Sequence, residues 1–151
     1  MKSELLIWTK AILMISLTQM SDCQGQSKDA SDIQGQIILS TDRESYTESD
    51  TIMLLLENGS AHEISVGLRC SNYLEMSYKK KEIQNWSEDL FLRYMYLRCP
   101  TLLNTIKAGA IFANSLPAEM FNSTGTFILQ VDISLLPDSS LRVVSNPFQI
   151  K

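Results

Sequence analysis

Histidine, cysteine and glycine are scarce in this sequence, which has one, three and six of them among 151 residues. Catalytic sites of the Ser-His-Asp and Cys-His types need a histidine beside the nucleophile, so only His62 could serve one. Zinc ligands usually come in close pairs, which the isolated Cys23, Cys70 and Cys99 do not form. No glycine-rich phosphate loop occurs either. These shortages argue against the hydrolase, zinc and nucleotide sites that a sequence most readily reveals.

A basic excess is missing as well. Lysine and arginine number 13 against 17 acidic residues, which gives a net charge of −4. Proteins that bind nucleic acid need a basic face to neutralise phosphates, so no nucleic-acid partner is expected. The one tight basic cluster, Lys79-Lys80-Lys81, separates two strand-like runs and is expected to be a solvated turn.

Two acidic pairs remain as candidates for acid–base chemistry, Glu48 with Asp50 and Glu88 with Asp89. Both lie in polar, turn-like sequence, where carboxylates stay ionised and solvated. His62 lies in the turn-like segment 58–62, where a solvated loop residue is expected. We therefore expect no catalytic residue, no metal and no cofactor, and we expect that the protein is not an enzyme.

The N-terminus differs in character from the rest of the chain. The uncharged stretch 11–20 follows Lys2 and Lys10 and is shorter than the roughly 20 apolar residues that span a bilayer. Its length is that of the apolar part of a secretory signal. We expect residues 1–22 to be a signal peptide, 23–33 a polar flexible tether and 34–151 one folded domain. An amphipathic N-terminal helix of a cytosolic protein is the alternative.

Cys23 stands directly behind this apolar stretch. The arrangement resembles a bacterial lipoprotein signal, in which cleavage occurs before a cysteine that then receives lipid. Ser21 fits that pattern, whereas Asp22 departs from it. Lipidation of Cys23 and a free or removed cysteine both stay open. The expected location is the periplasm, or the outer or cell membrane by a lipid anchor, with secretion as the alternative.

Cys70 and Cys99 lie inside the expected domain. Exported proteins meet an oxidising environment, in which two interior cysteines are expected to form a disulfide. Two buried free thiols are the alternative.

Hydrophobic residues recur with a period of two, which predicts strands that bury one face. The alternation is clear at 63–70 and 126–133, and the apolar run 52–56 indicates a central strand buried on both faces or nearly so. Asn58-Gly59-Ser60 predicts a hairpin turn. The expected strands are 36–41, 51–57, 63–69, 73–78, 91–98, 110–115, 125–134 and 141–150, with a helical turn in 87–96 as the alternative for one of them. Seven to eight short strands predict an all-β, antiparallel sandwich.

Four local patterns occur in order along the chain. They are Leu39-Ser40-Thr41-Asp42 with Glu44, Tyr46 and Asp50; Trp86 behind the lysine turn; the segment 124–129; and the segment 145–150. Together they resemble bacterial immunoglobulin-like domains of exported proteins and lipoproteins, and the resemblance covers 37–151. It implies an immunoglobulin-like sandwich in an exported protein. Phe127 stands where the family has tyrosine, so no tyrosine-corner hydrogen bond can form at that residue. The cysteines do not match those that join the two sheets of antibody domains.

An aromatic set surrounds the least regular segment and comprises Trp86, Phe91, Tyr94 and Tyr96. These side chains either fill the core or form an exposed binding patch. The function that fits best is a non-catalytic accessory or interaction domain, with an unknown protein or envelope component as partner and the membrane reached by a lipid anchor. The alternative is a protease inhibitor that presents the segment 96–104 as a rigid loop.

Overall fold

A computed structural model describes residues 36–135 and 139–151 of the chain. The expected signal peptide, the tether and Cys23 lie outside these residues. The described chain is built from strands and two short 3₁₀ turns, η1 (Arg93–Tyr96) and η2 (Ala118–Phe121). Within these ranges no helix is long and apolar enough to cross a membrane.

The first sheet consists of β1 (Ile37–Thr41), β3 (Thr51–Asn58) and β9 (Ile111–Pro117), with β3 in the centre and both pairings antiparallel. Burial along β3 alternates, because every second side chain faces the core. The apolar run 52–56 is therefore central, but it is not buried on both faces. Met53 and the partly covered Leu55 lie on the outer face of the sheet.

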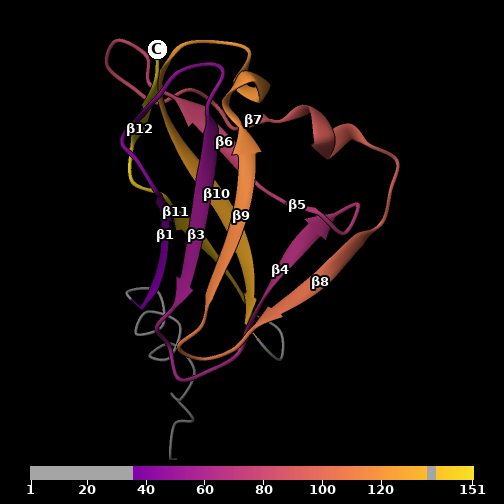
Figure 1. The fold of residues 1–151 in the computed structure, drawn as a ribbon. Coiled ribbons are helices and arrows are strands. Elements are labelled where there is room, and N and C mark those ends of the chain that lie inside the picture. The colour runs from indigo at the N-terminus through magenta and orange to yellow at the C-terminus, as the bar shows by residue number, and fades with distance from the viewer. Residues whose placement is uncertain (1–35, 136–138) are drawn as a thin grey trace, which may run out of the picture.

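The second sheet is organised by the long strand β10 (Gly125–Leu135) (Figure 1). Its two ends have different neighbours, all antiparallel: β4 and β11 towards Leu135, and β6 and β12 towards Gly125. β8 extends the sheet beyond β4, and β2 adds a short parallel pairing to β12. The remaining bounds are β2 Ser45–Tyr46, β4 Ile64–Arg69, β5 Tyr73–Leu74, β6 Ser77–Lys80, β7 Leu90–Phe91, β8 Thr101–Ile106, β11 Ser139–Val144 and β12 Phe148–Ile150.

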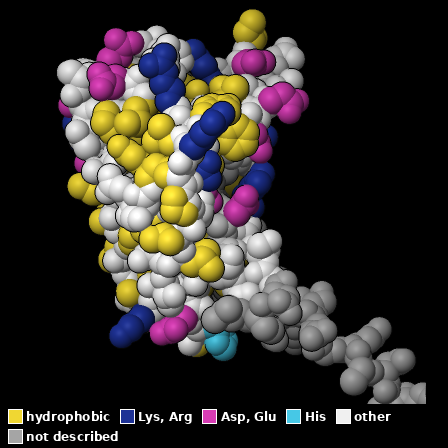
Figure 2. All heavy atoms as spheres, turned by 90° about the vertical axis from the view of Figure 1, so that its right-hand side faces the viewer, with side chains coloured by type: hydrophobic (Ala, Val, Ile, Leu, Met, Phe, Trp, Pro, Cys, Tyr) yellow, Lys and Arg dark blue, Asp and Glu magenta, His cyan; other side chains and the backbone are white. Residues whose placement is uncertain are grey.

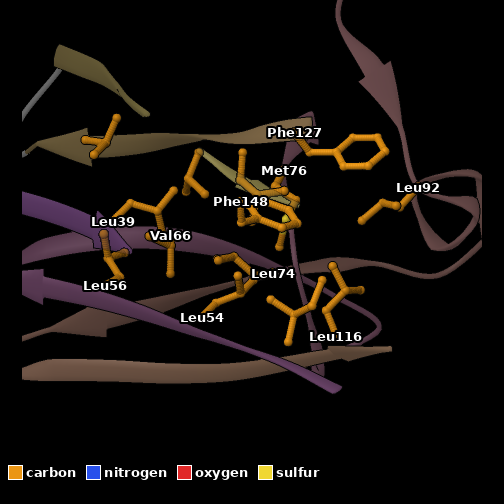
Figure 3. Packing of buried hydrophobic residues seen from close by; sticks show 14 of the residues in the cluster. Leu39, Leu54, Leu56, Val66, Leu74, Met76, Leu92, Leu116, Phe127 and Phe148 are labelled. Atoms are coloured by element: carbon orange, nitrogen blue, oxygen red, sulfur yellow. The ribbon is translucent and has the colours of Figure 1, made fainter. Parts of the chain in front are cut away.

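The two sheets face each other across one hydrophobic core (Figure 3). Leu54 and Leu56 come from the first sheet, and Val66, Phe127 and Phe148 from the second. The long strands follow the order β1-β3-β9 against β8-β4-β10-β11, which is an immunoglobulin-like arrangement. The predicted all-β antiparallel sandwich is confirmed.

Phe127 packs within an aromatic cluster, with its ring centroid 5.0 Å from Phe121 and 6.0 Å from both Tyr78 and Phe148. The corner hydrogen bonds that this residue cannot make are provided elsewhere. The hydroxyl of buried Tyr46 accepts from the Arg43 N–H at 2.9 Å and donates to Asp42 at 2.7 Å. Burial and the bond to Asp42 raise the pKa of Tyr46, so the phenol keeps the proton that it donates.

The predicted strand 91–98 is wrong. After β7 the chain turns into η1, and the next strand is β8, which was not predicted. Leu92 and Tyr94 are both buried, although they lie at the start of a 3₁₀ turn. Their spacing of two residues is also that of buried side chains on a strand, which explains the wrong prediction. The predicted strand 73–78 divides into β5 and β6 because the chain leaves β4 and crosses to β10.

The predicted hairpin at Asn58-Gly59-Ser60 is also wrong. β3 pairs with β1 and β9, while β4 pairs with strands of the second sheet, so this turn carries the chain from one sheet to the other. The predicted strand 141–150 divides into β11 and β12 around Pro147, which cannot donate a ladder hydrogen bond.

Candidate binding surface

Residues 71–98, here called the insertion, connect two neighbouring strands of the second sheet and contain β5, β6 and β7. β4 and β8 pair directly, with Arg69 opposite Thr101. A disulfide joins Cys70 and Cys99 just beyond that pair, with their Cα atoms 5.2 Å apart, and the Cys70 N–H donates to the Pro100 carbonyl at 3.1 Å. The predicted disulfide is confirmed, and it closes the insertion at its base.

The insertion is anchored by buried side chains. Leu92 reaches into the core (Figure 3). Tyr94 is only 4% exposed, stacks on Tyr73 at 4.8 Å between ring centroids and donates its hydroxyl to the Leu74 carbonyl at 2.7 Å. Burial raises the pKa of Tyr94, which keeps the phenol protonated as a donor. Tyr94 is therefore a structural residue.

A polar cluster fixes the end of the insertion against β8. The Arg69 guanidinium donates to the Leu97 carbonyl at 2.9 Å and lies 3.5 Å from the Glu75 carboxylate, which also accepts from the Thr101 hydroxyl. Gly67 leaves room for this carboxylate, because a Cβ there would lie 2.6 Å from a Glu75 oxygen. The segment before β8 is thus held on the outer face of the second sheet.

A second polar cluster holds the middle of the insertion. Asp89 lies 3.2 Å from Lys79 Nζ and 3.1 Å from Arg142 Nη1. Arg142 also donates two hydrogen bonds to Asp132, at 2.7 and 2.9 Å. These bonds hold the pKa of Asp132 below its ordinary value, and Arg142 ties Asp89 of the insertion to β10 and β11.

The candidate acid–base residues lie in structural or solvated positions. Asp50 caps a turn by accepting from the Thr47 N–H at 2.6 Å, which lowers the pKa of Asp50, and Glu48 is exposed beside it. Asp89 is engaged by two cations and Glu88 is exposed. His62 is exposed in the turn between β3 and β4. Within residues 36–135 and 139–151, no three acidic, histidine or cysteine residues gather in a way that could hold a metal ion.

The aromatic set divides between core and surface. Tyr94 is buried, whereas Phe91 is 48% and Tyr96 is 74% exposed. Trp86 is half-buried, forms an isolated bridge with Lys81 and carries the Lys81 ammonium 5.2 Å from its ring. Tyr94 therefore fills the core, Phe91 and Tyr96 lie on the surface, and a binding role for these two stays a prediction.

Three further apolar side chains of the insertion are exposed, which the sequence analysis missed: Ile83, Leu90 and Leu97. The sequence does indicate that Leu90 and Leu97 are exposed. Leu90-Phe91 and Tyr96-Leu97 are adjacent apolar pairs, and a surface segment can seldom bury both members of such a pair. The exposed apolar residues of the insertion are therefore Ile83, Leu90, Phe91, Tyr96 and Leu97.

The segment 96–104 is not a single protruding loop. Tyr96 closes η1, Cys99 is fixed by the disulfide, and 101–104 belong to β8 with β4 as neighbour. Only 97–100 lie outside regular structure. An inhibitory loop would therefore consist of 97–100 alone, and the inhibitor alternative stays a prediction.

No protein-family model and no curated protein sequence matches the chain. Several solved structures have a similar fold, among them the following three. A chain from a study of T cell specificity and activation by the bacterial superantigen toxic shock syndrome toxin-1 has a TM-score of 0.39 and 5% identity, over 76% of this chain and 98% of that one. A bacterial immunoglobulin-like domain of the M. primoryensis ice-binding adhesin has a TM-score of 0.37 and 7% identity, over 75% and 94%. PapD-like domain 7 of human CEP192, an ASH domain, has a TM-score of 0.35 and 14% identity, over 91% and 97%. At these values the matches assign no function.

Proposed function

We propose that this protein is an exported, non-catalytic interaction domain that binds a protein or another component of the cell envelope through the exposed apolar residues of its insertion. One observation carries the proposal. Tyr96 and Phe91 are 74% and 48% exposed on a segment that a disulfide and two polar clusters hold in place. Aromatic side chains are enriched in binding interfaces, and they dominate the binding energy there.

The way in which the insertion is held favours recognition. A binding surface on a mobile loop loses affinity because its side chains must be ordered in the complex. Here Tyr94, Arg69 and Asp89 already fix the backbone on either side of the exposed residues. The cost of ordering is therefore met by folding, and contact with a partner can contribute directly to affinity.

The binding surface can be tested with a paired substitution. We expect the double variant Phe91→Ser/Tyr96→Ser to lose at least about 30-fold in affinity for the envelope partner, since an interfacial aromatic residue often contributes about 2 kcal/mol or more. The full chain would be cross-linked to envelope fractions of its native host, the captured component identified, and its affinity measured with purified material. The double variant Ile38→Ser/Val144→Ser is the matched control, because these exposed apolar residues lie on β1 and β11. Equal capture by both double variants would contradict the proposed surface.

Export and lipid attachment form a separate part of the proposal. The apolar stretch 11–20 and the position of Cys23 support removal of residues 1–22 and a lipid on Cys23. We expect the native protein to have the mass of 23–151 plus lipid and to sediment with membranes, and we expect Cys23→Ser to leave the membrane fraction. Intact mass spectrometry and fractionation measure both. Recovery of the unprocessed chain from Met1 to Lys151 in the cytosol would refute export.

A further inference from the structure

The strand β8 ends the second sheet without the usual protection of an edge. Among the described residues, β8 pairs with β4 alone. Its sequence, Thr-Leu-Leu-Asn-Thr-Ile, contains neither a charged residue nor proline. Natural sheets usually protect an edge strand with lysine, proline or a bulge, because its unpaired N–H and C=O groups can form hydrogen bonds with a strand of another chain. β11, at the opposite edge of the sheet, carries Arg142.

The register shows which backbone groups of β8 are unpaired. The Cys70 N–H donates to the Pro100 carbonyl, so this pair stands at a hydrogen-bonded position of the ladder, although Pro100 has no N–H to donate in return. Bonded pairs recur at every second residue of an antiparallel ladder, which makes Leu102 and Asn104 the residues that bond to β4. The N–H and C=O groups of Thr101, Leu103 and Thr105 therefore point away from the sheet.

The same three residues present their side chains on the outer face. Leu103 is 71% exposed and stands opposite Gly67, over which the Glu75 carboxylate lies. Its neighbour Leu102 faces the other side of the sheet and is also exposed. Figure 2 looks onto the side of the molecule where β8 lies, and its lower middle part shows mainly hydrophobic and uncharged side chains.

The residues whose backbone groups point outward are Thr101, Leu103 and Thr105, and this order is symmetric about Leu103. We infer that β8 pairs antiparallel with β8 of a second copy of this chain, around a two-fold axis at Leu103. Leu103 then meets Leu103, and Thr101 meets Thr105 of the second copy, both as hydrogen-bonded pairs. Leu102 meets Asn104 as a non-bonded pair. No charged residue falls within this register, and β-branched and aliphatic cross-strand pairs stabilise a sheet.

The free edge of β9 fits a second copy less well. The Asn58 N–H donates to the Ala110 carbonyl, so the outward groups of β9 belong to Ile111, Ala113, Ser115 and Pro117. Pro117 has no N–H to donate, and an axis at Ala113 would place Ile111 opposite serine. β8 is therefore the edge that is complementary to itself.

Two cations flank the proposed pairing. Arg98 and Lys107 are exposed just before and just after β8, and the two-fold register brings Lys107 close to Arg98 of the second copy. Repulsion between exposed charges is screened by salt. The dimer is therefore expected to tighten as ionic strength rises, whereas an interface built on ion pairs would weaken.

Sedimentation of the full chain tests the inference, with Cys23→Ser in every sample to exclude intermolecular disulfides through that thiol. We expect a reversible dimer with a dissociation constant on the order of 10 to 100 μM, in keeping with a small interface. Leu103→Lys places two ammonium groups on the axis and should raise this constant at least about 30-fold. Because Leu103 is exposed, the melting temperature of the variant should equal that of the wild type at concentrations well below the dissociation constant, where both are monomers.

Ile111→Lys is the matched control, because Ile111 is 62% exposed on β9 and should tolerate the charge without loss of the dimer. The register is tested by mixing Leu102→Cys with Asn104→Cys, whose Cα atoms would lie about 4.5 Å apart in a non-bonded pair. Under oxidation the mixture should form a covalent dimer, and neither variant alone should do so. A wild-type chain that stays monomeric, a dimer that survives Leu103→Lys, or one that weakens with salt would overturn the inference.

Discussion

Replacing Cys70 and Cys99 together with serine is expected to lower the free energy of unfolding by about 3 to 4 kcal/mol. The disulfide closes a loop of 28 intervening residues (99 − 70 − 1). Opening it gives the unfolded chain the conformational freedom that the loop had removed. The loss is a large part of a typical net stability of about 5 to 15 kcal/mol. Urea unfolding of the two proteins measures it.

The disulfide lies at a tight turn of the backbone. Cys70 has a φ of 53° and Ser71 a φ of 63°, a backbone region that residues other than glycine seldom adopt. The disulfide helps to hold the chain in this tight turn. Wild-type protein reduced under native conditions is the control and should match the double variant. A difference below about 1 kcal/mol would show that the anchors at Tyr94 and Asp89 hold the insertion without the disulfide.

Asn58→Ala is expected to cost about 3 to 5 kcal/mol, because several buried polar groups lose their partners at once. Asn58 is fully buried. Its amide group donates to the carbonyls of His62, Ile106 and Lys107, at 2.8, 3.1 and 3.1 Å. Its side-chain oxygen accepts from the Ser60 hydroxyl at 2.7 Å. This one side chain joins the turn after β3 to the turn between β8 and β9.

Ser60→Ala is the matched control for Asn58→Ala. It removes a single hydroxyl from the same buried turn and should cost only about 1 kcal/mol. Thermal and urea unfolding of both variants give the comparison. If the two variants were equally stable, the carbonyls around Asn58 would have to be satisfied in another way, and the central role of this residue would be wrong.

The sequence was sufficient for the class of fold. Alternation at 63–70 and 126–133 gave β4 and β10, since a strand with one buried face imposes a period of two. Prediction from sequence failed where the pattern of buried residues does not follow the type of secondary structure. Leu92 and Tyr94 are both buried from a turn, and the adjacent leucines 102 and 103 hide the period of β8 because both faces of that edge strand are partly exposed.

The candidate surface was predicted only in part, for a related reason. The disulfide was predicted because Cys70 and Cys99 are the two cysteines inside the expected domain. Whether an aromatic side chain is exposed depends on neighbours distant in sequence, such as Tyr73 and Leu74, which enclose Tyr94. The sequence predicts a hairpin at Asn58, because local sequence cannot show that the side-chain amide contacts carbonyls 48 and 49 positions away.

The position of β10 in the chain has a consequence for the timing of folding. All strands of the first sheet have emerged once Pro117 is synthesised, but β4, β6, β11 and β12 share a neighbour that begins only at Gly125. A growing chain that stops before this residue cannot close its core, so it stays open to chaperones and proteases. Delay of this kind would suit the proposed export, in which the polypeptide crosses a membrane before it folds.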